Sequence, residues 1–496
     1  MDGTVTDGTV TDGTDVEDER ISRRAALRGL GATGALGLAG CLGGGDDGNG
    51  SSGSGTDGGS NGNGGANGSG SGTTTGSGGG GSGPVTIGVL EPLSGDLQYY
   101  GQLALWGILS GFAYKGDNDP LTDASTGRKS LSVGDTDYEL LVRDTQLDPS
   151  TAQSLATDLV QGEDVDTLLG CTSSASAAQV ISTVTKQVEV PTMIGPAASA
   201  GITADSETCG EMVFRASENT AMDARSGGRF VAEQDEVSRV YLFGADYSFG
   251  RAVVNNYREV FEQAGIEIVG ERFVEQGYSE WTGLLDNAQS AGAQGIVAGF
   301  TVQTLPALFR TYLTGNYDFR VFGGFATRVT NRIIGELLAN TLGTPLTEQK
   351  LQQSNLGPFT TRYHWNQYDN EINNQFVDSH VQAYGSVPDL FSSGMFTAAS
   401  AIVQAVEESG TTAGEGIANA LRGMTVADTP KGQDGYTFQE YNNQARSAMT
   451  IANPIPTKEE FQESWGAAVM PSAPVATIGA DGTTIPQDSE QMNCSL

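Results

Sequence analysis

Histidine is scarce in this chain, which limits the acid–base chemistry it can perform. Its 496 residues include 2 histidines, His364 and His380, and they do not form a zinc-binding pair. Hydrolase-like and dinucleotide-like glycine patterns occur at 58–62 and 43–48, but both lie in a Gly-rich stretch with no strand before them. We therefore expect no enzymatic activity, no metal and no cofactor.

A cysteine near the N-terminus ends a segment typical of protein export. Arg23 and Arg24 precede a short apolar run that finishes at Leu38-Ala-Gly-Cys41. This charged start, apolar centre and small-residue exit predict a signal peptide, and the arginine pair indicates the twin-arginine route. Residues 1–41 are therefore expected to be an acidic leader plus export signal, with Cys41 lipidated. The competing interpretation is a buried helix rich in Ala, Gly and Leu.

The segment after Cys41 is expected to be a tether. Residues 42–83 are almost entirely Gly, Ser, Asn, Thr and Asp, a composition that cannot bury enough apolar surface to fold. As a flexible coil it would reach about 35 Å. A lipid, a tether and a folded body predict a protein anchored at the outer face of the cell membrane.

The other cysteines leave their pairing open. With Cys41 lipidated, Cys171, Cys209 and Cys494 remain. Three cysteines allow at most one disulfide within the chain and leave one thiol over. The sequence does not decide which two would pair.

Charge excludes one class of partner. The formal net charge is −34, with 60 acidic and 26 basic residues, of which six are lysines. A nucleic-acid-binding protein needs a basic face, so none is expected here. An acidic, lysine-poor surface stays soluble when salt screens charge, which indicates a salt-loving organism, a haloarchaeon. An ordinary acidic protein is the alternative.

The body, 84–496, alternates predicted strands with predicted helices. Strands are expected at 85–90, 138–142, 167–170, 191–194, 239–243, 267–269, 295–298 and 320–322. Helices are expected at 100–114, 150–161, 175–187, 249–264, 281–291 and 305–313. This alternation predicts parallel sheets covered on both faces. A break near Arg215–Thr220 divides it into two similar α/β lobes, followed by a mainly helical section from Tyr363 to Arg422.

The body resembles the type I solute-binding proteins of ABC importers, specifically the branched-chain amino acid (leucine/isoleucine/valine) receptors. The segments that carry the resemblance are 87–95, Tyr100-Gly101, 143–160, 168–181, 190–203, 213–217 and 242–253.

The resemblance implies two doubly wound α/β lobes joined by a three-segment hinge, with the ligand in the interlobe cleft. The crossings are expected near 215–220, 357–363 and 424–435. Lobe 1 would then comprise 84–216 plus 363–430, and lobe 2 217–362 plus 431–496.

Several ligand contacts in lobe 1 follow from the resemblance. Ser174 stands at a predicted helix start, where a hydroxyl and an N–H can hold a carboxylate; the alternative is an ordinary helix cap. Ser173 and Ser176 are neighbouring candidates. Ala197, through its carbonyl, and Ser199, through its hydroxyl or N–H, match positions that grip the ligand's main chain. Tyr100 matches an aromatic pocket wall, with a core aromatic as the alternative.

Lobe 2 departs from the pattern of the receptors. Phe249 and Phe300 stand where tyrosines are common, and Phe325 stands near the usual acidic acceptor of the ligand ammonium. A buried ammonium without an acceptor is costly. Either another residue accepts it, Asp246 being the first candidate, or the ligand is not an α-amino acid.

The predicted function is that of a monomeric, lipid-anchored receptor. It would capture a small-molecule ligand, an amino acid or a related amphiphilic carboxylate, and deliver it to an ABC permease. A ligand sensor of the same fold feeding a signalling receptor is the alternative. An extracellular hydrolase is a remote one, since the histidine-bearing motifs are missing.

Overall fold

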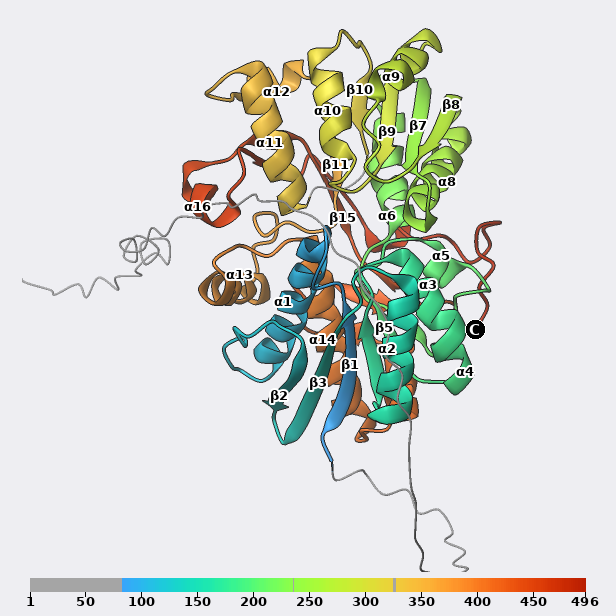
Figure 1. Cartoon of the computed structure of the whole chain (residues 1–496), viewed down its shortest axis with the longest axis vertical. Coiled ribbons are helices and arrows are strands. Elements are labelled where there is room, and N and C mark those ends of the chain that lie inside the picture. Colours follow the sequence, from blue (N-terminus) through green and yellow to red (C-terminus); the bar gives the residue numbers. More distant parts are fainter. Residues whose placement is uncertain (1–82, 235, 324–326) are drawn as a thin grey trace, which may run out of the picture. The chain divides into compact units, whose positions relative to one another are not determined.

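The computed structural model describes residues 83–496, apart from 235 and 324–326 (Figure 1). The predicted export residues Arg23 and Arg24, the lipidation residue Cys41 and the cleft residue Phe325 lie outside the described residues. Within the described part, none of the helices combines the length and apolarity needed to cross a lipid bilayer.

The first lobe is built on a six-stranded sheet. Its order is β2 (Gly127–Val133), β3 (Thr136–Asp144), β1 (Val85–Glu91), β4 (Thr167–Gly170), β5 (Thr192–Ile194) and β6 (Val213–Arg215). All neighbours pair in parallel except β2, which runs antiparallel to β3 at the edge. The sequence did not predict β2, because an edge strand with little buried surface has a polar composition that resembles a loop.

Helices cover both faces of this sheet because its central strand is apolar on both sides. Val85, Ile87 and Val89 pack with helices α1 and α14, whereas Leu90 packs with α2 and α3. This alternation is the period-2 pattern of a strand. The lobe's helices are α1 (Gln98–Lys115), α2 (Pro149–Gly162), α3 (Ser174–Val180), α4 (Lys186–Val188), α5 (Gly201–Ala204), α13 (Glu371–Tyr384), α14 (Leu390–Ser409) and α15 (Gly414–Leu421).

The second lobe repeats the design with a parallel four-stranded sheet. Its order is β10 (Arg320–Phe322), β9 (Gly295–Gly299), β7 (Arg239–Ala245) and β8 (Glu267–Val274). Helix α8 packs on one face, and α9, α10 and α11 pack on the other. The helices near this sheet are α6 (Thr220–Asp223), α7 (Arg229–Glu233), α8 (Ser248–Gln263), α9 (Trp281–Ser290), α10 (Leu305–Thr314), α11 (Arg328–Leu342) and α12 (Glu348–Gln353). The predicted two-lobed α/β fold is therefore confirmed.

Short antiparallel strands complete the described chain. One sheet has the order β11 (Phe359–Thr361), β15 (Met449–Ala452), β18 (Ala476–Ile478); a second has β12 (Thr425–Val426), β13 (Tyr436–Phe438), β14 (Ala445–Arg446). A third pairs β16 (Pro454–Pro456) with β17 (Val469–Pro471), flanking α16 (Gln462–Trp465). In Figure 1, β11 and β15 run between the two larger sheets.

The third crossing between the lobes lies later in the chain than predicted. It was expected near 424–435, but Val426, Tyr436 and Ala445 are buried in the first lobe's core. The chain instead leaves through β15, whose successors β16 and β17 contact α12 and α11 of the second lobe. Local sequence could not show this, because the core residues of 426–445 are contributed by short, irregular strands.

One disulfide ties the C-terminal tail to the first lobe. Cys209 bonds Cys494, with Cα atoms 5.9 Å apart, and Cys171 is a buried free thiol. Of the pairings that the sequence left open, the fold selects the one that fastens the chain's end beside α5.

Candidate ligand-binding site

A cavity of about 550 Å³ opens where the strands of both large sheets end. Residues that follow β4 and β5 line it from the first lobe, and residues that follow β7, β9 and β10 line it from the second. Ligands of doubly wound sheets bind beyond the carboxyl ends of the strands. The cavity lies at that position in both lobes.

Small hydroxyl side chains form the part of the first-lobe wall that follows β4. Thr172, Ser173 and Ser174 line the cavity between β4 and α3. Ser173, not Ser174, is the helix N-cap, since its Oγ accepts a hydrogen bond from Ser176 N–H at 3.3 Å. Ser174 Oγ accepts from Ser199 N–H at 3.0 Å. Because the Ser174 hydroxyl is the acceptor in that bond, its own hydrogen can point to an acceptor on a ligand.

Three predicted contacts lie behind this wall. The carbonyl oxygens of Ala197 and Ser199 accept from the buried Arg215 Nη1 at 3.2 and 2.6 Å, so they hold a guanidinium instead of lining the cavity. Pro196 and Ala198 line it in that loop. Ser176 is fully buried outside the lining, and its Oγ has no hydrogen-bond partner among the described residues.

Arg215 itself is a buried cation held by neutral acceptors. Besides the two carbonyls, it donates to Gln444 Oε1 at 2.6 Å and to Thr203 Oγ1 at 2.7 Å. Burial, with a smaller contribution from Arg362, lowers its pKa to about 9. The loop after β5 is therefore fixed from behind by this guanidinium.

Aromatic rings dominate the second-lobe wall. Phe249 and Phe300 both line the cavity, as predicted, and Phe300 packs edge-on against Trp281 with ring centroids 5.3 Å apart. Asp246 also lines it, but this half-exposed carboxylate already pairs with Arg251. An ammonium bound at Asp246 would therefore compete with the arginine.

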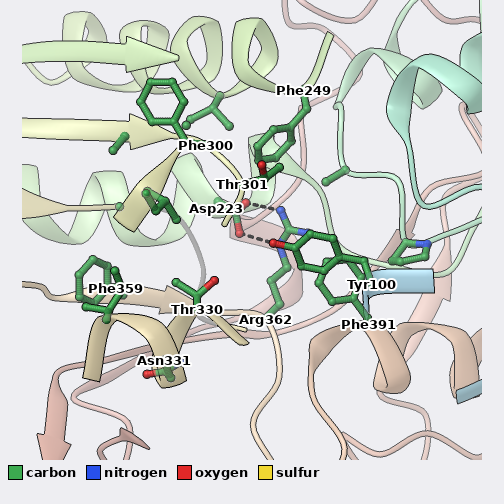
Figure 2. Close-up of a pocket in the computed structure, with 18 of the residues that line it drawn as sticks. Tyr100, Asp223, Phe249, Phe300, Thr301, Thr330, Asn331, Phe359, Arg362 and Phe391 are labelled. Atoms are coloured by element: carbon green, nitrogen blue, oxygen red, sulfur yellow. Dashed lines mark hydrogen bonds and ion pairs between the residues drawn. The ribbon is translucent and has the colours of Figure 1, made fainter. Parts of the chain in front are cut away.

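A buried ion pair that the sequence did not single out spans the hinge. Arg362 follows β11 and Asp223 ends α6, and both line the cavity (Figure 2). Arg362 Nε donates to Asp223 Oδ1 at 2.9 Å, and Nη2 bonds Oδ2. Burial alone would lower the pKa of Arg362, but the adjoining carboxylate outweighs burial and raises that pKa. One indication of its role was available from the sequence, because Arg362 falls within the predicted second crossing between the lobes.

A second buried pair lies next to it in the hinge. Lys431 Nζ is 2.7 Å from Glu218 Oε1, which also accepts from Ser447 Oγ at 3.0 Å. Burial would raise the pKa of Glu218, but the adjoining Lys431 ammonium and a hydrogen bond from the Tyr436 hydroxyl lower it. Arg362 Nη1 donates to the Glu218 carbonyl at 3.3 Å, which joins the two pairs.

Tyr100 connects the two lobes directly. Its ring lines the cavity beside Phe391, with centroids 4.8 Å apart, and its hydroxyl accepts from Val302 N–H at 3.3 Å. Val302 follows β9, in the second lobe. Next to it, Thr301 lines the cavity with an Oγ1 that has no hydrogen-bond partner among the described residues. A ligand could satisfy that hydroxyl.

Among residues 83–496, outside the gaps at 235 and 324–326, no group of three His, Cys, Asp or Glu side chains is placed to hold a metal ion.

Comparison with known proteins places this arrangement in a family. Residues 84–458 match the family model of periplasmic binding proteins. Leu/Ile/Val-binding protein homolog 6 from Brucella abortus (strain 2308) is 25% identical over 311 residues, covering 62% of this chain and 71% of the relative.

Solved structures show the same fold. An amino acid ABC transporter substrate-binding protein from Pseudomonas fluorescens Pf-5 gives a TM-score of 0.66 at 20% identity, over 84% of this chain and 100% of that one. A leucine-binding protein from Thermotoga maritima MSB8 gives 0.62 at 18% identity, over 80% and 99%. An ABC transporter solute-binding protein from R. palustris in complex with benzoate gives 0.60 at 19% identity, over 81% and 99%.

Proposed function

The chain belongs to the periplasmic binding protein family, and we propose that it captures an amino acid of the branched-chain type, or a related amphiphilic carboxylate, for an ABC importer. One observation carries the proposal: residues after the strands of both sheets converge on one cavity, which combines the hydroxyl groups after β4 with aromatic rings from both lobes. That combination suits a polar head joined to an apolar body.

The proposal does not specify whether the ligand carries an amine. Of the three carboxylates that line the cavity among the described residues, Asp223 and Asp246 already pair with Arg362 and Arg251, and Glu275 is exposed to solvent. A buried ammonium needs an acceptor of its own. Acids without an amine, such as 2-keto acids and aromatic acids, are therefore candidates beside leucine.

Calorimetric titration of the purified protein with leucine, phenylalanine and their 2-keto acids tests the proposal. We expect at least one of the four to bind, with the keto acids tolerated. Leucine binding with no keto-acid binding would show that an ammonium acceptor is present. Failure of all four to bind, in protein whose native mass spectrum shows no retained ligand, contradicts the proposal.

The anchored state is proposed from the sequence. Cys41, following Leu38-Ala-Gly, would carry the lipid, and Arg23 and Arg24 would direct twin-arginine export. Cys41→Ser should release the protein from the membrane or leave it unprocessed, and Lys at both arginines should block export. A Cys41→Ser protein that stays membrane-bound at its normal size contradicts the anchor, and efficient export of the double Lys variant contradicts the route.

A further inference from the structure

The cavity continues beyond the interlobe cleft into the second lobe. There it is lined by Phe309, Val321, Ile334, Leu338, Leu356 and Phe359, which we call the apolar chamber. These residues come from α10, β10, α11, Leu356 and β11. Figure 2 shows Phe359, with Thr330 and Asn331 near it, on the opposite side of the drawn residues from Tyr100 and Phe391.

Charged groups lie outside the chamber. The charged residues that line the cavity among the described ones are Asp223, Asp246, Glu275 and Arg362. Asp223 and Arg362 belong to the hinge, and Asp246 and Glu275 follow β7 and β8. Hydrophobic residues therefore surround the far end of the cavity, and the charges are confined to its near end.

The polar residues next to the chamber are occupied locally. Thr330 Oγ1 lies 2.8 Å from Thr327 Oγ1, and Asn331 Nδ2 donates to the Thr327 carbonyl at 2.9 Å. Both bonds belong to the first turn of α11. Asn453, which also lines the cavity, is exposed and thus marks its rim. A ligand in the chamber would therefore make mainly apolar contacts and few hydrogen bonds.

The size of the cavity exceeds the needs of a branched-chain side chain alone. Its volume of about 550 Å³ falls in the range of roughly 300–1,000 Å³ that is typical of drug-sized ligands. Phe309, Ile334 and Leu356 are 6–8% exposed although they belong to the lobe's core, and each borders this space. Apolar surface of this kind gains from contact with an apolar group of matching length.

We propose that the chamber receives the tail of the ligand, and that the ligand is an amphiphilic acid or amino acid whose alkyl or arylalkyl tail is longer than the side chain of leucine. The inference rests on the proposed function and specifies its ligand class. The head group lies between the serines after β4 and the hinge, and the tail passes Phe300 to reach α11.

Two homologous series test the proposal on the wild-type protein. One is norvaline, norleucine, 2-aminooctanoate and 2-aminodecanoate; the other is the straight-chain carboxylic acids of the same lengths. Affinity should rise about fourfold per added methylene until the chamber is full. Leucine or norvaline binding most tightly, with weaker binding of every longer chain, overturns the chamber's role and leaves the proposed function standing. Absence of binding in both series overturns the chamber's role, and the titrations with leucine, phenylalanine and their 2-keto acids decide the proposed function separately.

A matched pair of variants locates the tail. Ile334 lines the chamber, whereas its neighbour Ile333 does not line the cavity, so Ile334→Phe fills the space and Ile333→Phe is the control. The ratio of 2-aminodecanoate to leucine affinity should fall at least tenfold in Ile334→Phe and stay unchanged in the control. Equal ratios in the two variants overturn the assignment. Leu356→Phe provides a second filling variant, and circular dichroism checks that each variant is folded.

Discussion

The turn after β4 gives the first-lobe side of the cavity three small hydroxyl side chains, whereas the strand ends of the second lobe supply mainly aromatic and aliphatic side chains. Thr172 and Ser173 lie in the short connection between β4 and α3, and Ser174 is the first residue of α3. Phe249 and Phe300 are anchored in the second lobe's own cores. The first wall can therefore select a head group by hydrogen bonds, while the second selects a body by size.

The hinge segments set the position of one cavity wall relative to the other. Asp223 ends α6, directly after the first crossing, and Arg362 lies in the second, so their ion pair ties the two crossings together. Arg362 also donates to the carbonyl of Glu218, whose carboxylate pairs with Lys431 of the first lobe. These buried ion pairs fix the hinge segments relative to one another, next to the cavity. Substitutions in the hinge pair, in the contacts between the lobes and at the head-group site distinguish the roles of these three regions.

The largest effect is expected from breaking the hinge pair. Arg362→Met leaves Asp223 buried without its partner and should lower the free energy of unfolding by about 3–5 kcal/mol. Denaturant unfolding at fixed salt measures this. Arg251→Met is the control, since its pair with Asp246 is half exposed and should be worth about 0–1 kcal/mol. Adding Asp223→Asn to Arg362→Met should recover part of the loss. Equal losses of stability in Arg362→Met and Arg251→Met would contradict the larger contribution assigned to the buried pair.

A pH-dependent effect is expected where the lobes touch at Asp389. This carboxylate caps α14 and accepts from Arg328 N–H of the second lobe at 3.4 Å. Burial raises the pKa of Asp389 from 3.8 to about 6. The folded state therefore holds the proton more tightly, so the stability contributed by the neutral acid is lost as pH rises from about 4 to 6.

Asp389→Asn removes that dependence while keeping an acceptor for the helix cap. The free energy of unfolding of the variant, relative to wild type, should rise by about 2–3 kcal/mol between pH 4 and pH 7. Unfolding curves at several pH values measure the difference, which also cancels the titration of the many surface carboxylates. A difference that does not change with pH would show that Asp389 titrates normally.

An intermediate effect is expected on the first wall. Ser174→Ala should weaken ligand binding about ten- to a hundredfold, because it removes a hydrogen bond of about 1.5–3 kcal/mol to a charged group. It should also cost stability, since Ser199 N–H loses its acceptor. Ser176→Ala is the matched control on the same helix: Ser176 does not line the cavity, so affinity should stay the same. Equal affinities in the two variants would reduce Ser174 to a structural role.

The smallest effect is expected from the hydrogen bond between the lobes at Tyr100. Tyr100→Phe keeps the ring beside Phe391 but removes the hydroxyl that accepts from Val302 N–H. Affinity should fall only a few-fold, in line with a net value of about 0.5–1.5 kcal/mol for one such bond. Tyr138→Phe serves as the comparison, since that hydroxyl is buried in the first core without a partner among the described residues. Loss of affinity in both variants would indicate a general effect of lost hydroxyls.

The sequence predicted the elements of the fold better than the site. Each predicted strand and helix of the two sheets is present, and β4 occupies 167–170 as expected, because apolar periodicity is a local property. Tyr100, Ser173, Ser174, Asp246, Phe249 and Phe300 line the cavity, and their contact with a ligand stays a prediction. Their positions follow strand ends, which the periodicity already indicates.

Contacts between distant segments were decided by the tertiary structure. Asp223 and Arg362 are 139 residues apart, and no feature of either neighbourhood reveals that they pair. Ala197 and Ser199 turn their carbonyls to Arg215 instead of the cavity because that buried guanidinium needs acceptors.

By itself, then, the sequence determined most of the strands and helices of the two large sheets and left the pairing of its cysteines open. The tertiary structure chose Cys209 and Cys494, 285 residues apart, and it opened the chamber between α10 and α11. The physical reason is the range of the interactions: hydrophobic period and turn chemistry act over a few residues. Ion pairs, disulfides and cavities depend instead on how whole elements pack against one another. That packing brings together residues that are far apart in the sequence, so no local stretch of sequence reveals it.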